Sequence, residues 1–101
     1  MTREMLQNEL EEILGSEQVY FQRPESTKLK YPAIVYSLSD KVAQNADNKK
    51  YLLTNRYTVT VMSTRSTNTI ADDILRHFQH SAFDRRFVSD NLYHDVLTVF
   101  Y

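Results

Sequence analysis

No cysteine occurs in this chain of 101 residues. Disulfide bonds, thiolate metal sites and thiol nucleophiles are therefore excluded, and the composition fits a reducing compartment. Gly15 is the single glycine, whereas phosphate-binding loops, dinucleotide-binding fingerprints, nucleophile elbows and the KH-domain loop each need more than one. Most proteins that act on nucleotides are excluded with these motifs.

Long apolar runs are also missing. No stretch approaches the roughly 18 residues that a membrane span needs, and Arg3, Glu4 and Glu9 interrupt the start of the chain where a signal peptide would be apolar. We therefore expect a protein of the cytoplasm. The net charge of −1 provides no field that would attract a polyanion, so nucleic acid is not an expected partner.

The residues that are present predict one α+β domain spanning residues 1–101. Hydrophobic residues make up 42% and charged residues 25%, which is ordinary for a globular protein. Apolar spacing predicts an antiparallel sheet of about five strands with two helices packed on one face, in the order α-β-β-β-α-β-β. The expected helices span 3–14 and 69–80, and the expected strands span 17–22, 31–38, 51–62, 83–89 and 92–101.

Each predicted helix has an apolar stripe and signals at its ends. Thr2 and Gly15 suit the two ends of the first helix, and several residues of 66–69 can cap the second. The apolar stripes consist of Met5, Leu6, Leu10, Ile13 and Leu14 in the first helix, and Ile70, Ile74, Leu75 and Phe78 in the second.

The last predicted strand has large apolar residues on both faces. Because alternate side chains of a strand point to opposite sides, the two sets are Leu92, Val96 and Phe100, and Tyr93, Leu97, Val99 and Tyr101. Two helices cover only one side of a sheet. We therefore expect the second side to meet another molecule, as in an assembly protein that is not an enzyme.

Residues 39–50 are polar and predict a long mobile hairpin loop between two strands. Loops of this length are often functional. Asp90 and Asn91, in contrast, predict a tight turn between the last two strands.

Candidate sites for chemistry have simpler explanations. Asp73, His77 and His80 share one side of the second helix and could in principle surround a metal. The same residues are explained by favourable contacts with the helix dipole and by solvated pairs of Asp73 with His77 or Asp72 with Arg76. Serine, histidine and aspartate occur without the signature of a hydrolase. We expect no metal, no cofactor and no catalytic residues.

Basic and aromatic residues alternate around Arg85 and Arg86, as on some nucleic-acid surfaces, although a strand with one polar and one apolar face explains this as well. The chain also has seven tyrosines and no tryptophan, and tyrosine is common at interfaces. If the strands alternate as predicted, not all of the strand tyrosines point inward, so some face a partner. These are Tyr36, Tyr57, Tyr93 and Tyr101.

Two stretches, Asp47-Asn48-Lys49 through Tyr57-Thr58-Val59 and Asp90-Asn91-Leu92-Tyr93-His94 through Phe100-Tyr101, carry a family resemblance. Together with an initial helix and a Tyr-Pro-Ala-Ile-Val-Tyr strand, they resemble the tail terminator or tail completion proteins of long-tailed phages, also described as minor capsid or head-tail joining proteins. The resemblance covers nearly the whole chain.

The resemblance implies a subunit that works by binding alone. It implies a six-membered ring on the head-proximal end of the tail tube, which stops tube growth and contacts the head connector. The implied partners are other copies of the chain, the tail tube protein and the connector or completion protein, first in the host cytoplasm and then in the virion. The predicted partner-binding residues are Asn45, Asp47, Asn48, Lys49, Lys50, Arg85, Arg86, Tyr93 and Tyr101.

Two other functions remain open at this point. A small ligand-binding or regulatory α+β domain could act as a dimer through its sheet edges, with a pocket lined by the same tyrosines. An RNA-binding domain would need exposed sheet aromatics beside a basic rim, and the acidic balance of charge argues against it.

Overall fold

The computed structural model describes the backbone of residues 3–22, 30–46 and 50–101, and the side chains of residues 3–22, 30–39 and 55–101. The elements are α1 (Arg3–Leu14), β1 (Val19–Phe21), β2 (Ala33–Ala46), β3 (Lys50–Ser63), α2 (Ile70–His77), β4 (Ser81–Ser89) and β5 (Leu92–Phe100). This α+β architecture confirms the predicted class. The first helix has the expected bounds, whereas α2 is shorter than 69–80 and β4 begins before residue 83.

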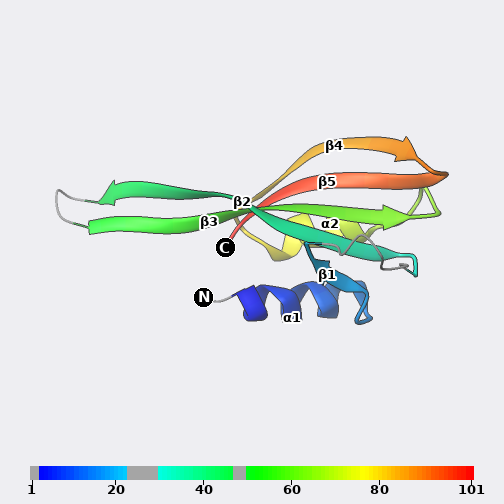
Figure 1. The fold of residues 1–101 in the computed structure, drawn as a ribbon, viewed down its shortest axis with the longest axis horizontal. Coiled ribbons are helices and arrows are strands. Elements are labelled where there is room, and N and C mark those ends of the chain that lie inside the picture. Colours follow the sequence, from blue (N-terminus) through cyan, green and yellow to red (C-terminus); the bar gives the residue numbers. More distant parts are fainter. Residues whose placement is uncertain (1–2, 23–29, 47–49) are drawn as a thin grey trace.

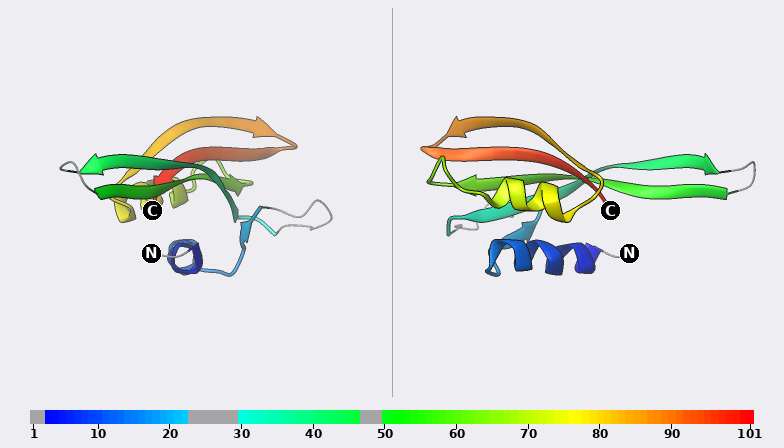
Figure 2. Two further views of the ribbon diagram at one scale, coloured as in Figure 1. Left: turned by 60° about the vertical axis from the view of Figure 1, so that its left-hand side comes forward. Right: turned by 180° about the vertical axis from the view of Figure 1, so that it is seen from behind.

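The strands form one sheet in the spatial order β1-β2-β3-β5-β4. Both helices lie on the same side of this sheet (Figure 1), and the two views of Figure 2 show the opposite side without a helix over it. We call the side with α1 and α2 the helix face and the other side the open face.

The prediction of a fully antiparallel sheet is wrong at one edge. β1 runs parallel to β2, with Val19 beside Ile34 and Phe21 beside Tyr36, so the sheet is mixed. Backbone hydrogen bonds just before and just after β1 also join it to β2. Ile34 N–H donates to Gln18 O and Gln22 N–H donates to Tyr36 O, each at 2.9 Å. Parallel neighbours need a long connection, and residues 22–32 separate these two strands.

The core fills the space between the helix face and the helices. The apolar spacing of α1 directs Leu6 and Leu10 at the sheet, and α2 contributes Ala71 and Ile74 from its short stripe. Gly15 has φ +78° and its N–H donates to Glu11 O at 2.8 Å, which ends α1 as predicted. The sheet side of the core consists of Val19, Ile34, Tyr36, Tyr57, Val59, Val61, Leu97 and Val99.

The segment predicted as a long loop is mostly strand. β2 continues to Ala46 and β3 resumes at Lys50, and the two strands stay paired from Val42 opposite Thr54 to Ala46 opposite Lys50. We call residues 42–46 and 50–54 the arm. In Figure 1 the arm projects beyond both helices, and the molecule measures 50 Å along its longest axis against 26 and 23 Å.

The error has a physical reason. A polar composition argues against a strand only if the strand must bury one face in a core. The arm lies beyond the helices (Figure 1) and buries no face against them. The backbone groups between its two strands pair with each other, and this ladder needs no apolar side chains. The predicted contact residues Asp47, Asn48 and Lys49 lie outside the described residues.

Candidate interaction surface

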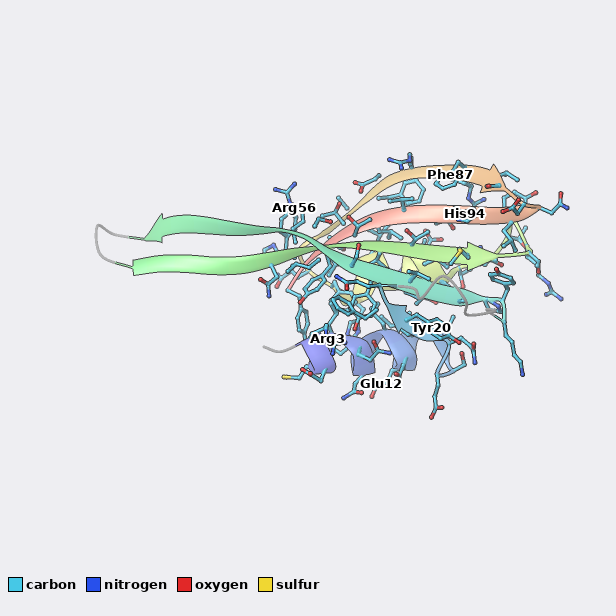
Figure 3. All side chains as sticks on the ribbon, in the orientation of Figure 1. Arg3, Glu12, Tyr20, Arg56, Phe87 and His94 are labelled. Atoms are coloured by element: carbon cyan, nitrogen blue, oxygen red, sulfur yellow. The ribbon has the colours of Figure 1, made fainter. Side chains whose placement is uncertain are left out.

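The open face is one candidate surface, because no described helix or strand covers it. Register places Val35, Thr60, Val96 and Arg85 in one row across four strands. The neighbouring row ends in His94 and Phe87, whose rings stack with centroids 4.6 Å apart and planes 5° from parallel. Figure 3 shows Arg56, Phe87 and His94 on the side of the sheet away from α1. The middle of this face carries the β-branched side chains of Val35, Thr60 and Val96, and its β4 side carries Arg85 and Phe87.

The edge strand β4 is exposed along nearly its whole length. Among the described strands it pairs only with β5, and every residue from Ala82 to Ser89 is exposed. Three of its large apolar side chains retain much of their accessible surface, at 47% for Phe83, 40% for Phe87 and 61% for Val88. Long exposed edges of this kind are templates for pairing with another strand. Sequence analysis missed the apolar members of this surface.

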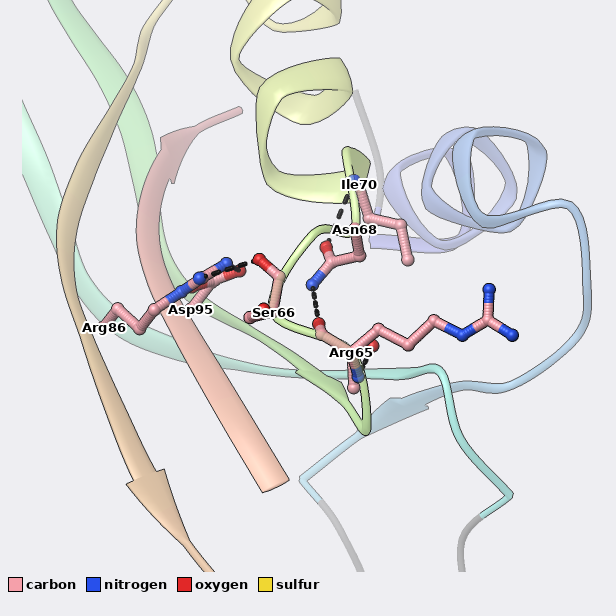
Figure 4. A network of polar contacts seen from close by, with 7 residues as sticks. Arg65, Ser66, Asn68, Ile70, Arg86 and Asp95 are labelled. Atoms are coloured by element: carbon pink, nitrogen blue, oxygen red, sulfur yellow. Dashed lines mark hydrogen bonds and ion pairs between the residues drawn. The ribbon is translucent and has the colours of Figure 1, made fainter. Parts of the chain in front are cut away.

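Arg86 and Asp95 connect β4 to the rest of the fold (Figure 4). Nε of Arg86 donates to one carboxylate oxygen of Asp95 at 2.5 Å, and a terminal nitrogen donates to the other at 3.0 Å. Another terminal nitrogen donates to Ser66 O at 2.9 Å. The hydrogen bonds to Asp95 raise the pKa of Arg86, and Asp95 itself is 1% exposed. This charge-assisted, two-point contact holds β4, β5 and the segment before α2 together.

The segment before α2 is fixed by its own polar side chains. The Asn68 side chain donates to Arg65 O at 3.0 Å and accepts from Ile70 N–H at 3.3 Å, so Asn68 satisfies the helix start. Thr69 occupies the capping position without a side-chain bond to the helix. A shallow groove of about 570 Å³ lies beside this segment, between α2 and β4. Its walls are Ser66, Thr67, Asn68, Thr69, Ala71, Asp72, Leu75, Phe83, Arg86 and Asp95.

Tyr36, Tyr57, Tyr93 and Tyr101 all point inward, contrary to the prediction that some of them face a partner. Register places Tyr36, Tyr57, Tyr93 and Tyr101 on the helix face together with Leu97. The buried Tyr36 hydroxyl donates to Gln7 Oε1 at 2.6 Å, so this polar group is satisfied inside the core. Tyr93 packs under Arg86, whose guanidinium carbon is 5.5 Å from the ring centroid.

Tyr101 connects the end of the sheet to both helices. Its hydroxyl donates to the Glu9 carboxylate of α1, and its ring meets that of Phe78 edge-on at 6.0 Å. Burial raises the pKa of Tyr101 to about 12, with a further contribution from the Glu9 hydrogen bond. His77 of α2 contacts the second oxygen of Glu9 at 2.8 Å. Burial opposes the charge of Glu9, but the bonds from Tyr101 and His77 outweigh it and lower the Glu9 pKa.

The candidate metal ligands are separated by these contacts. Asp73 pairs with Arg76 at 3.3 Å instead of with His77, and His77 turns to Glu9. Among the described side chains, those of residues 3–22, 30–39 and 55–101, no group of three histidine, aspartate or glutamate residues could hold a metal ion.

The predicted contact residues fall in two regions. Asn45 and Lys50 lie near the end of the arm, while Arg85, Arg86, Tyr93 and Tyr101 belong to β4, β5 and the residue after β5. Of the latter four, Arg86 and Tyr101 already have intramolecular polar partners, and Arg85 is the exposed cation, 5.7 Å from the Phe87 ring centroid. Asp95 was missed, although its position between inward apolar residues was a signal, since a buried carboxylate needs a cation.

Neither described helix is long and apolar enough to cross a membrane. The comparison with known protein families gives no match, and the comparison with curated proteins gives none either.

Proposed function

We propose that this protein is a structural assembly subunit of a long-tailed phage. It caps the head-proximal end of the tail tube as a ring and joins the tube to the head connector. The proposal starts from the sequence resemblance described above and is supported by surfaces that the isolated chain leaves uncovered. The protein acts by binding, in the host cytoplasm during assembly and then at the head-tail junction of the virion.

The arm is the observation that carries the proposal. β1 flanks β2 only at residues 34–36, and β5 flanks β3 only from Arg56 onward. Among the described residues, the arm strands therefore pair only with each other. A two-stranded ribbon is marginally stable in water, and its free edges offer unpaired backbone groups. Contact with a neighbouring subunit or with the tube would stabilise it.

A ring follows if the arm binds a different surface from the one that carries it. Such a head-to-tail contact is repeated around an axis and closes when its rotation allows. The open face, with Arg85 and Phe87 at its margin, is an available receiving surface. Asn45 and Lys50 at the end of the arm are the proposed contact residues on the other side.

Ligand binding by a dimer is the second candidate function. The groove beside α2 has a volume within the range of small-molecule sites, but none of Tyr36, Tyr57, Tyr93 and Tyr101 lines it. A ligand-binding domain would show a saturable thermal shift with a small molecule, and an assembly subunit would instead bind tail tubes.

The first experiment deletes the gene from the phage genome that carries it and images the lysate by negative-stain electron microscopy. Overlong tails without heads would support a tail terminator. Normal-length tails beside filled heads would support a role at the joining step. Intact infectious particles would refute the proposal and leave ligand binding as the leading function.

A second experiment complements the deletion with a gene for a shortened arm, in which Asn-Gly replaces residues 42–54 and connects the paired Lys41 and Asn55. We expect this variant to fail in tail assembly while the full-length gene restores it. Normal assembly with the shortened arm would remove the arm from the proposal.

A further inference from the structure

The outer side of β4 has a defined pattern of unpaired backbone groups. Hydrogen-bonded and non-hydrogen-bonded pairs alternate along an antiparallel ladder. Phe100 N–H donates to His80 O at 2.9 Å, so Ser81 and Phe83 occupy non-hydrogen-bonded positions opposite Val99 and Leu97. Their N–H and C=O groups therefore point away from β5.

The other end of β4 has the same phase. Asp90 and Asn91 have φ 54° and 63°, as in the tight two-residue turn that closes on a hydrogen-bonded pair, here Ser89 with Leu92. Counting back from Ser89 places Arg86 and Val88 at non-hydrogen-bonded positions. Four residues of β4 thus point their backbone groups outward, and they are Ser81, Phe83, Arg86 and Val88.

A β-bulge at Asp84 changes the order in which the side chains of β4 point to the two faces of the sheet. Phe83 pairs with Leu97 and Arg85 with Val96, so Asp84 is the extra residue. The Asp84 side chain accepts from Thr98 Oγ1 at 2.8 Å on the open face, the same face as Arg85. The assignment of side chains to the two faces is symmetric about a point between Asp84 and Arg85. Ser81, Phe83, Arg86 and Val88 lie on the helix face, and Ala82, Asp84, Arg85 and Phe87 lie on the open face.

We infer that β4 binds β4 of a second copy of this chain, antiparallel and around a two-fold axis between Asp84 and Arg85. In this register Phe83 lies opposite Arg86 of the other copy, and Ser81 lies opposite Val88. All four are the residues with outward backbone groups, so each pair can exchange hydrogen bonds. Each of them also meets a residue of its own face, and the two sheets continue into one another.

Charge and size are complementary in this arrangement. Asp84 of each copy lies opposite Arg85 of the other. The contact therefore contains two ion pairs, related by the two-fold axis. Phe87, exposed on the open face, lies opposite the small Ala82. Phe83 on the helix face lies beside the guanidinium of Arg86, a favourable arrangement of cation and ring.

The bulge explains why β4 would pair with β4 of a second copy in preference to another strand. A regular strand alternates its faces without interruption, so it cannot match both halves of β4 in one register. A second copy carries the same interruption at the same place. The bulge therefore protects the edge against other strands while leaving it complementary to itself.

This contact goes beyond the ring proposed above. A two-fold contact closes after two copies, whereas a ring needs a head-to-tail contact. Pairing through β4 does not involve the arm, although it includes Arg85 and Phe87 at the margin of the open face. It describes the purified chain in solution, and its test requires no phage component. Its failure therefore leaves the assembly proposal to be judged by electron microscopy.

Sedimentation equilibrium of the purified chain tests the contact. We expect a mass twice the 11.9 kDa of one chain. Asp84→Lys and Arg85→Glu place like charges opposite each other, so each should weaken dimerisation by about tenfold or more. The double variant restores opposite charges and should restore the dimer. Glu12→Lys, the same charge change on the exposed side of α1, is the matched control and should leave the mass unchanged.

Cysteine cross-linking tests the register. Because the chain has no cysteine, an Asp84→Cys preparation mixed with an Arg85→Cys preparation should form a disulfide-linked heterodimer on mild oxidation, since these positions face each other. Asp84→Cys mixed with Ser89→Cys is out of register and should not. A monomeric chain, an oligomer indifferent to both charge reversals, or cross-linking in the control mixture alone would each overturn the inference.

Discussion

Arg86 on the exposed edge strand holds the buried Asp95 of the adjacent strand with two hydrogen bonds, at 2.5 and 3.0 Å. The relationship is asymmetric, because the Arg86 side chain is 37% exposed and that of Asp95 is 1% exposed. The carboxylate depends on its partner for charge compensation, while the guanidinium also reaches Ser66 O.

We expect Arg86→Ala to lower the free energy of unfolding by about 3 kcal/mol, since it leaves an uncompensated buried carboxylate. Urea denaturation followed by circular dichroism measures this. Arg65→Ala, at an exposed position before α2, is the matched control, and a change within about 0.5 kcal/mol is expected for such a surface substitution. Equal losses in the two variants would contradict a structural role for the Arg86–Asp95 pair.

The Glu9 contacts predict a stability that depends on pH. The pKa of Glu9 is lowered from its ordinary 4.5, so its contribution is present above pH 4.5 and is lost as the pH falls through the lower value of the folded state. We expect Glu9→Gln to destabilise the protein by about 1 kcal/mol at pH 7, with a smaller difference at acidic pH.

Urea midpoints measured from neutral to acidic pH check this expectation. Glu12→Gln, an exposed position on the same helix, serves as the control and should give a difference that is small throughout. A Glu9→Gln deficit that stays constant across the whole pH range would mean that charge on Glu9 does not contribute.

The turn between β4 and β5 predicts a stabilising substitution. Asn91 has φ 63°, a conformation that glycine adopts without the steric cost of a Cβ atom. We expect Asn91→Gly to raise the free energy of unfolding by about 0.5 kcal/mol and Asn91→Val to lower it by about 1 kcal/mol. Thermal unfolding ranks the three proteins, and a more stable valine variant would argue against the positive φ.

The arm is predicted to be dispensable for folding. The backbone of the arm lies outside the sheet body, since among the described residues β1 flanks β2 only at 34–36 and β5 flanks β3 only from Arg56 onward. We therefore expect the variant with Asn-Gly in place of residues 42–54 to keep its far-ultraviolet circular dichroism and a melting temperature close to that of the full-length chain. Loss of cooperative unfolding would show instead that the arm supports the body.

Much of the fold could be predicted because local patterns and tertiary packing agree. The stripe of α1 and the positive φ of Gly15 follow from apolar spacing and from the freedom of glycine. The tight turn at Asp90 and Asn91 follows from residues that tolerate positive φ. The alternation of β5 correctly separated Leu97 and Val99 from Val96 and Phe100.

The errors arise where non-local contacts decide. Nothing local distinguishes a parallel from an antiparallel partner for Val19–Phe21, since the pairing depends on where the chain returns. The polar segment 39–50 gave no core pattern, yet its ladder needs none. Tyr36, Tyr57, Tyr93 and Tyr101 share one face because strand pairing brings β2, β3 and β5 into phase, which single-strand alternation does not reveal.

The candidate surface was predicted only in part for the same reason. Arg85 was nominated because of its basic and aromatic neighbours. Arg86 was nominated as a partner-binding residue, but its side chain binds Asp95 within the chain. The outward side of β4 depends on which strand ends the sheet. That order is a property of the whole topology, so Phe83 and Val88 carried no signal of exposure.

The route by which the arm enters the sheet has a mechanical consequence. β3 continues from the arm into the body and stays in register with β5 from Arg56 to Ser63 without interruption, whereas β2 has a register shift between Leu38 and Asp40. Ladder hydrogen bonds lie across the strands, so tension along β3 loads many of them together in shear. A pull on the arm is therefore transmitted to the centre of the sheet, and the irregularity in β2 is where bending under load would concentrate.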